Sequence, residues 1–341
     1  MPEGSNTEGG AFRASFPEYI YELGPESDLS YLSREDRSNA ELEQVLEQRE
    51  ARKISTDVFD EHGQKLAKVE YDPKTGDVLA VFPERFVNVE GKAENPNETV
   101  YVTDENGRIT DERLTRAEAR AQKKRYLVVT TLLFQEDPSE QRLSMLVQKR
   151  SSKKEIDPGQ VSASAHGVAK EIFSQSQRRI DDGQTAALIN ASLELNEELR
   201  HDAEPFHVHV WPGNHRELLL YSEEKKWNDP NTVWMITEGY LGDSGYPLGR
   251  FTNPRTRAIL AGFIFTKEPF NVSVDPGELE GASWKKPEDV RHDPEATEDV
   301  AKAILQFRTQ FAKDMPVVRR YGPVLLQNTI RRWRGLDVYK P

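Results

Sequence analysis

The chain has 341 residues, of which 36% are hydrophobic and 30% are charged, and its formal net charge is −12. A nucleic-acid partner is disfavoured because its phosphates are bound by Lys and Arg, and the absence of cysteine excludes disulfides, zinc–thiolate sites and thiol nucleophiles. No apolar run approaches the roughly 20 residues of a membrane helix and no basic-then-apolar signal opens the chain, so we expect a cytoplasmic protein of one or two globular domains with no membrane partner.

The N-terminal third divides into two ranges of different composition. Residues 1–53 are acidic and poor in large apolar side chains, so we expect a largely disordered tail with one short helix at residues 33–53, whose apolar stripe is too thin to support a core. Residues 54–120 alternate apolar runs with turn-forming segments, which predicts a small β subdomain and a linker helix at residues 111–124. The strands expected in it are residues 66–71, 78–82 and 99–102. Such a subdomain is marginal by itself, so we expect it to dock on the rest of the chain or on a second copy in a homodimer.

From residue 121 to residue 315 the pattern predicts a mixed α/β domain. Apolar runs at residues 126–134 and 143–148, joined by a polar loop, predict an antiparallel hairpin of buried strands. Helices are expected at residues 185–200 and 295–313, and further strands at 206–211, 218–221, 232–237 and 259–266. A mixed sheet covered by helices is the economical architecture, and residues 316–341 form a basic C-terminal extension.

The helix expected at residues 185–200 carries three carboxylates on one face. At 100° per residue, Glu194, Glu197 and Glu198 lie together on the side opposite the leucines. Like charges at this spacing repel, and no cation lies one turn away within the helix. Either the face is solvated, or a cation from elsewhere balances it. A hard divalent cation such as Mg²⁺ or Mn²⁺ prefers these oxygen ligands.

Motifs before this helix and within it follow a recognisable order. Residues 150–151, 153–154, 158–159 and 164–168 read Arg-Ser, Lys-Lys, Pro-Gly and Ser-Ala-His-Gly-Val. The helix reads Leu-Glu-Leu-Asn-Glu-Glu-Leu-Arg over residues 193–200. These runs resemble the Nudix hydrolase superfamily, nearest its isopentenyl-diphosphate-isomerase-like branch, whose helix reads Arg-Glu-apolar-x-Glu-Glu-x-Gly.

The sequence also departs from the motif of that family. Leu193 stands where the family has arginine and Arg200 where it has glycine, which makes the Nudix box degenerate. The Gly-His order is inverted at His166 and Gly167, and residues 172–181 are inserted before the helix. Such losses are typical of a scaffold that has abandoned hydrolysis. A non-catalytic Nudix-fold nucleotide-binding or scaffold protein is therefore the alternative to an enzyme.

The resemblance implies a Nudix-type mixed sheet sandwiched by helices and a hydrolase that depends on Mg²⁺ or Mn²⁺. Its substrate would be a nucleoside diphosphate derivative or a related diphosphate, cleaved at the diphosphate linkage by water. An isomerase is disfavoured, because the resembling isomerases use a cysteine. The site residues that the resemblance implies are, as metal ligands, Glu194, Glu197 and Glu198; as general base, Glu198 or Glu278, with Glu280 as the fallback; and, as phosphate contacts, Arg150 and Lys154. The alternative for both loop glutamates, 278 and 280, is that they only solvate their loop.

Three further groups of residues have expected roles outside the carboxylate helix. Glycine-rich residues 239–249 are expected to form a long loop near the pocket, where Tyr240 or Tyr246 stacks on a base or ring. His207 and His209 alternate along an expected strand and so share a face, as in a transition-metal site. No acidic ligand lies at a compact spacing from them, so local packing is favoured. The basic C-terminal extension is expected to contact the acidic tail.

Overall fold

A computed structural model of the chain places most residues between 38 and 304. The described residues are 38–84, 97–105, 107–137, 142–153, 157–200, 204–213, 215–225, 227, 229–236, 243–244, 255–266, 272–274, 279–297, 300 and 304. The helices are α2 (Asn39–Arg52), α3 (Arg116–Ala121), α4 (Gly183–Glu198), α5 (His215–Lys225) and α6 (Pro287–His292). The strands of the main sheet are β1 (Ile54–Phe59), β2 (Lys65–Tyr71), β3 (Val78–Pro83), β4 (Thr99–Thr103), β5 (Ile109–Thr115), β6 (Tyr126–Asp137), β7 (Arg142–Arg150), β8 (Val161–Ser162), β9 (Ala165–Val168), β10 (Phe173–Ser174), β12 (His207–Trp211), β13 (Thr232–Ile236), β14 (Asp243–Ser244), β15 (Arg255–Ile264) and β17 (Leu279–Lys285). A separate pair consists of β11 (Leu199–Arg200) and β16 (Ser273–Val274).

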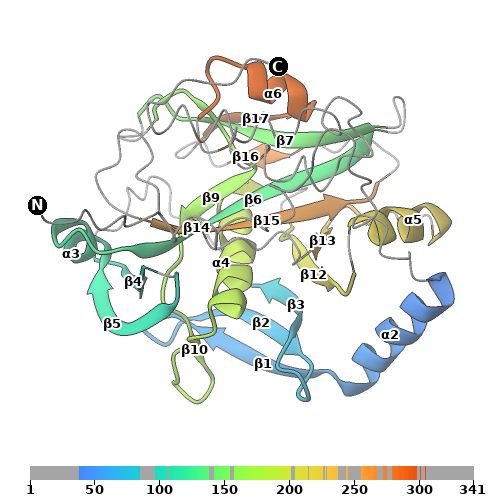
Figure 1. The fold of residues 1–341 in the computed structure, drawn as a ribbon, viewed down its shortest axis with the longest axis horizontal. Helices are drawn as coiled ribbons and strands as arrows, with labels where there is room; N and C mark the ends of the chain where they lie inside the picture. The colour runs from blue at the N-terminus through green and yellow to red at the C-terminus, as the bar shows by residue number, and fades with distance from the viewer. Residues whose placement is uncertain are drawn as a thin grey trace, which may run out of the picture.

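The main sheet is mixed, and its hydrogen-bonded neighbours follow the order β10-β1-β2-β3-β12-β13-β15-β6-β4-β5. β6 pairs in parallel with β15 along one edge. Along its other edge β6 pairs antiparallel with β4, β9 and β7, one after another. β6 and β7 are consecutive in the chain and form the antiparallel hairpin expected from the sequence. Helices pack on this sheet (Figure 1), so the expected mixed α/β class is confirmed.

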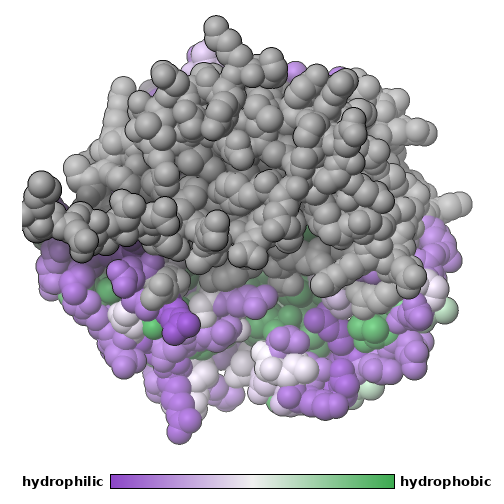
Figure 2. All heavy atoms as spheres, in the orientation of Figure 1, coloured by the Kyte–Doolittle hydropathy of each residue, from purple (hydrophilic) through white to green (hydrophobic). Residues whose placement is uncertain are grey.

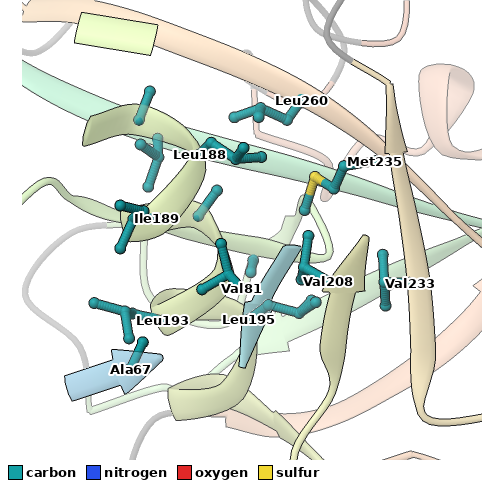
Figure 3. Close-up of a cluster of buried hydrophobic side chains, with 14 of the residues drawn as sticks. Ala67, Val81, Leu188, Ile189, Leu193, Leu195, Val208, Val233, Met235 and Leu260 are labelled. Atoms are coloured by element: carbon teal, nitrogen blue, oxygen red, sulfur yellow. The ribbon is translucent and has the colours of Figure 1, made fainter. Parts of the chain in front are cut away.

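α4 lies within the bend of the main sheet. Figure 1 shows it between β1, β2 and β3 on one side and β6 and β15 on the other, and it contacts β3, β6, β9 and β15. Every residue at positions 186–196 is buried, because strands pack around the helix on more than one side. Figure 3 shows part of the resulting core, with Leu188, Ile189, Leu193 and Leu195 of α4 among Val81, Val208, Met235 and Leu260 of the strands.

A second hydrophobic core lies on the other face of the sheet. Side chains alternate between the two faces along a strand, and β6 accordingly sends Leu133 to the α4 core and Phe134 to the second core. Leu42 of α2, Leu218 of α5 and Val290 of α6 belong to this second core. Helices therefore cover both faces of the sheet, as the sequence predicts.

Residues 54–120 contribute strands to the main sheet at two places. β1, β2 and β3 join it through Val81 of β3, which pairs antiparallel with Val208 of β12. β4 and β5 join it through Val102 of β4, which pairs with Tyr126 of β6. The range expected as one small β subdomain is thus divided, in the part that the structure describes, between two regions of a larger sheet.

α2 is packed on the rest of the protein. Its start is set by a capping box in which Ser38 Oγ accepts from the Glu41 N–H and Glu41 Oε2 accepts from the Ser38 N–H. Leu42 is 1% exposed, and Arg49 Nη1 donates to the Val210 carbonyl oxygen at 3.0 Å. The helix expected at residues 33–53 therefore begins at Asn39. Its thin apolar stripe is stabilised by packing on the second core of the same chain. Residues 1–37 of the expected tail lie outside the described residues.

Three other expected elements differ from the structure. Residues 218–221, expected as a strand, lie in α5, because Leu218 and Tyr221 are one turn apart on a buried helix face. Residues 111–124, expected as a helix, begin in β5 and become helical at α3, where Thr115 and Glu118 form a capping box. Of the helix expected at residues 295–313, positions 295–297 are not helical, 300 and 304 are helical, and those from 305 onward lie outside the described residues.

One face of the described part of the chain is mainly hydrophilic. Figure 2 shows polar residues over most of the described part of this face, with hydrophobic atoms visible between them. Ile54, at 43% exposure, is the one large exposed hydrophobic side chain in the described ranges. None of the described helices has the length and apolar character needed to cross a membrane.

Candidate functional site

The three glutamates of the carboxylate helix lie at the C-terminal end of α4. Asp182, the N-cap residue, accepts the Thr185 N–H at 2.7 Å, which sets the start of the helix. Glu194 is 9% and Glu198 is 6% exposed, whereas Glu197 is half-buried. This burial excludes the solvated face, because a buried carboxylate needs a cation or hydrogen-bond donors.

Glu194 packs directly against the backbone of β9. A Cβ atom on Gly167 would lie 2.0 Å from Glu194 Cδ, so glycine is required where the carboxyl group now lies. Burial raises the pKa of Glu194 well above its usual range. The charges of Glu197 and Glu198 also raise this pKa, while the charge of Lys170 lowers it. The inverted His-Gly order noted in the sequence thus places the glycine opposite this glutamate.

Glu198 is held by two donors from neighbouring strands. Gln148 of β7 donates from Nε2 to Glu198 Oε2 at 2.7 Å. The backbone N–H of His166 in β9 donates to the same oxygen at 3.1 Å. Gln148 is itself buried, so β7 and β9 together orient this carboxylate.

Lys170, two residues beyond β9, supplies a positive charge to the helix. Its Nζ lies 2.6 Å from Glu197 Oε1 and 3.6 Å from Glu98 Oε1. Burial by itself would lower the pKa of Lys170, but the charges of Glu197, Glu194 and Glu98 outweigh burial and raise it. Lys170 is therefore a charged counter-ion of the kind that the helix lacks in its own sequence.

Asn190 of α4 holds the backbone of Lys170 in place. Asn190 Oδ1 accepts the Lys170 N–H at 2.9 Å, and Asn190 Nδ2 donates to the Lys170 carbonyl oxygen at 3.1 Å. Asn190 is fully buried and lies one turn before Glu194. One helix thus carries both the carboxylates and the amide that positions their counter-ion.

Glu98, immediately before β4, adds a fourth carboxyl group. Burial raises the pKa of Glu98, the charge of Lys170 lowers it, and the charge of Glu197 raises it. We call Glu98, Glu194, Glu197 and Glu198 the glutamate cluster. Lys170 interacts electrostatically with Glu98, Glu194 and Glu197, and the charge of Arg116 also lowers the pKa of Glu98.

A divalent cation fits the donor chemistry of the glutamate cluster, since carboxylate oxygens are the ligands that Mg²⁺ and Mn²⁺ prefer. Over the described ranges, however, no three His, Asp or Glu side chains converge as a metal site requires. Glu197 binds Lys170, and Glu198 binds Gln148 and His166. The assignment of Glu194, Glu197 and Glu198 as joint metal ligands therefore stays a prediction.

The other candidate site residues are only partly described. Arg150 lies two residues after Gln148 in β7, so strand alternation puts both on the same face. Lys154, Tyr240 and Glu278 lie outside the described residues. Their roles as phosphate contact, stacking residue and general base stay predictions.

Glu280 and the two strand histidines, which the sequence offered as site residues, contact neighbouring residues of the chain. Glu280, the fallback general base, accepts the backbone N–H of Ser152 at 2.9 Å, and this hydrogen bond lowers the pKa of Glu280. The rings of His207 and His209 pack edge-on against Phe82, with centroids 5.3 and 5.6 Å away. Burial lowers the pKa of His209. The two histidines therefore have the local packing role that the sequence favours.

Sequence reasoning missed three residues of this site, Glu98, Gln148 and Lys170. Glu98 and Lys170 lie in connecting segments, where hydrophobic periodicity carries no information about position. Gln148 ends an expected strand, and its burial follows from the position of α4. The sequence did indicate that the carboxylates of the helix lack a cation within the helix. It did not indicate which residue supplies that cation.

The sequence matches no family model and no curated protein. The structure is similar to the Deinococcus radiodurans protein DR0079, at 14% identity and a TM-score of 0.33, over 61% of this chain and 97% of that chain. It is similar to the Nudix domain of Shewanella oneidensis NrtR, solved with ADP-ribose, at 15% identity and a TM-score of 0.32, over 58% of this chain and 99% of that domain. A Nudix hydrolase from Alicyclobacillus acidocaldarius is similar at 13% identity and a TM-score of 0.30, over 63% of this chain and 97% of that chain. These likenesses are too distant to assign an activity, and the mixed α/β fold rests on the strand pairing described above.

Proposed function

We propose that this chain is a Nudix-type hydrolase that uses Mg²⁺ or Mn²⁺ to cleave the diphosphate linkage of a nucleoside diphosphate derivative or a related diphosphate. The observation that carries the proposal is the glutamate cluster, where buried and half-buried carboxyl groups lie beside the ion-paired Lys170. Carboxyl oxygens gathered in this way are the ligand type that a hard divalent cation prefers, and such a cation also binds phosphate oxygens. The sequence resemblance supports the same assignment.

Each group of residues has a stated role in this proposal. Glu194, Glu197 and Glu198 would hold the cation, which when bound would neutralise the diphosphate and lower the pKa of the attacking water. Water attacks one phosphorus, the bond to the bridging oxygen breaks, and Glu198 or Glu278 takes the proton. Gln148 keeps Glu198 oriented for this step.

Substrate binding falls to residues outside the glutamate cluster. Arg150 and Lys154 would contact phosphate oxygens, since cationic side chains form strong hydrogen bonds with them. Arg150 shares a strand face with Gln148, whose side chain contacts Glu198, and this alternation supports its role as a phosphate contact near the cluster. Tyr240 would stack on the base or ring of the substrate.

A second candidate function is favoured by the ion pair between Lys170 and Glu197. A protein that has abandoned hydrolysis no longer needs a metal, and a lysine can balance the carboxylates in its place. The chain would then bind a nucleotide or serve as a scaffold without cleaving a substrate. Leu193 and Arg200, the departures from the Nudix box, support the same alternative.

A substrate screen distinguishes the two functions. The panel consists of nucleoside diphosphate sugars, dinucleoside polyphosphates, NADH and ADP-ribose, each with Mg²⁺ or Mn²⁺, and products are separated by chromatography. Metal-dependent cleavage of at least one compound is expected for the hydrolase. Calorimetric binding of a compound without metal dependence and without cleavage would instead establish the binding protein.

Replacing Glu198 with Gln tests the catalytic site directly. Turnover of the substrate found in the screen should fall by a factor of roughly 100 or more, because a carboxylate that holds the cation or accepts a proton is lost. The fold should survive, since the amide has the same shape. Glu112→Gln is the matched control, because Glu112 pairs with Lys124 and is not a member of the glutamate cluster. Unchanged turnover in the Glu198→Gln variant would contradict the mechanism.

A further inference from the structure

The ion pair between Lys170 and Glu197 is partly shielded from water. The distance of 2.6 Å between Lys170 Nζ and Glu197 Oε1 is that of a short, charge-assisted hydrogen bond. Lys170 and Glu98 are 20% and 22% exposed in their side chains, so solvent screens their attraction less than it screens a surface pair. The electrostatic role of Lys170 in this region is correspondingly strong.

The two ends of Lys170 are held in different ways. Both backbone hydrogen bonds to Asn190 fix the main chain of Lys170 against α4. The side chain beyond the backbone is a flexible four-carbon stem, and its ammonium group is held by carboxylates alone in the contacts described. Rotation of this side chain is enough to separate the ammonium group from Glu197 while the backbone stays in place.

We propose that Lys170 is the resident counter-ion of the glutamate cluster and that it competes with a divalent cation for Glu197. In the metal-free protein the ammonium group balances the carboxylates, and a cation reaches Glu197 when this group leaves. The identity of the competing cation rests on the proposed function. The stabilising role of Lys170 in the metal-free protein does not depend on it.

Binding of Mn²⁺ to the full-length protein tests the competition. Calorimetry should show that Lys170→Met binds Mn²⁺ roughly tenfold more tightly than the original protein, since the competing positive charge is gone. Lys170→Arg keeps that charge and should bind as weakly as the original protein. Lys124→Met is the matched control, because Lys124 pairs with Glu112 at 2.9 Å outside the cluster, and its Mn²⁺ affinity should not change.

Thermal unfolding in EDTA tests the counter-ion role without any metal. Lys170→Met should unfold at a lower temperature than the original protein, and Mn²⁺ should restore part of the loss. The double variant Lys170→Met, Glu197→Gln should unfold at a higher temperature than Lys170→Met, because it removes the unbalanced carboxylate. If Lys170→Met does not fold, Lys170→Gln takes its place in both experiments.

The outcomes separate this inference from the proposed function. Equal Mn²⁺ affinity in Lys170→Met and the original protein, or a double variant that unfolds in EDTA at or below the temperature of Lys170→Met, would overturn the inference. Tighter Mn²⁺ binding by Lys170→Met, with no cleavage of any diphosphate by any variant, supports the inference and overturns the proposed hydrolase. Absence of Mn²⁺ binding in every variant would overturn both the competition and the metal site.

Discussion

The carboxyl group of Glu194 occupies the volume that a Cβ atom at position 167 would fill. Gly167 pairs with Val129 of β6, so the position of the glutamate is set by the backbone of the main sheet. Burial raises the pKa of Glu194, which makes its charge sensitive to any change that admits water. The lack of a side chain at Gly167 therefore allows both the buried position of Glu194 and its raised pKa.

Gly167→Ala is expected to displace Glu194 and to lower the free energy of unfolding by about 1 to 3 kcal/mol, because the added methyl group overlaps a buried carboxyl group. Gly281→Ala is the matched control, since a Cβ atom there meets nothing within 4 Å, and its effect should stay within about 0.5 kcal/mol. Urea unfolding followed by circular dichroism measures both variants. Equal losses would show that the contact between residues 167 and 194 is not tight.

At the scale of elements, the segment between β9 and α4 is tied down by a buried carboxylate. Glu171 has a fully buried side chain and accepts from Arg113 Nε at 2.7 Å and from Arg179 Nη1 at 2.6 Å. The inserted residues 172–181 contain β10, which pairs with β1 through Phe173. The insertion is thus part of the sheet, and it anchors the chain next to Lys170.

Arg179→Met should lower the free energy of unfolding by about 3 kcal/mol, because it leaves the buried charge of Glu171 with half of its cationic support. Arg113→Met is the comparison. The Arg113 side chain is 51% exposed and that of Arg179 is 11% exposed, so solvent screens the first pair more and its loss should cost about 1 kcal/mol. Chemical denaturation of both variants in one buffer shows which of them loses more free energy of unfolding. The reverse order would contradict the burial argument.

At the scale of the whole molecule, the N-terminal segments complete the fold around α4. Figure 1 shows β1, β2 and β3 on the side of α4 away from β6. α2 reaches a distant part of the chain through Arg49, which donates to the Val210 carbonyl oxygen, and through Glu43, which pairs with Lys225. β1, β2 and β3 therefore help to bury the helix that carries the glutamates, and α2 packs on the second core.

A chain that begins at residue 54 is accordingly expected to be less stable than the full chain. Leu42→Ala isolates the main contact and should cost about 2 to 4 kcal/mol, because it opens a cavity in the second core. Ile54→Ala is the control, since Ile54 is exposed and its truncation should cost less than about 1 kcal/mol. Thermal and urea unfolding compare the shortened chain and the two point variants with the full chain. Full stability of the shortened chain would show that α2 contributes nothing to the fold.

The sequence by itself determined the elements whose patterns are long and regular. The helix expected at residues 185–200 is α4, which has a clear helical periodicity. The runs expected at 126–134 and 143–148 are β6 and β7, which are apolar runs joined by a polar loop. The four-residue run at 218–221 fits a strand and a helix equally well, so it was assigned wrongly. The shared face of Glu194, Glu197 and Glu198 also follows from helical geometry alone.

The tertiary structure decided what surrounds those glutamates. Glu98, Gln148 and Lys170 come from three separate segments, and their meeting depends on how the sheet bends around α4. Burial of Glu194 likewise depends on the backbone of β9, which no local pattern reports. Periodicity describes which side of an element a residue occupies. The partner on that side is a property of the fold, and here the partner of Glu197 is a lysine.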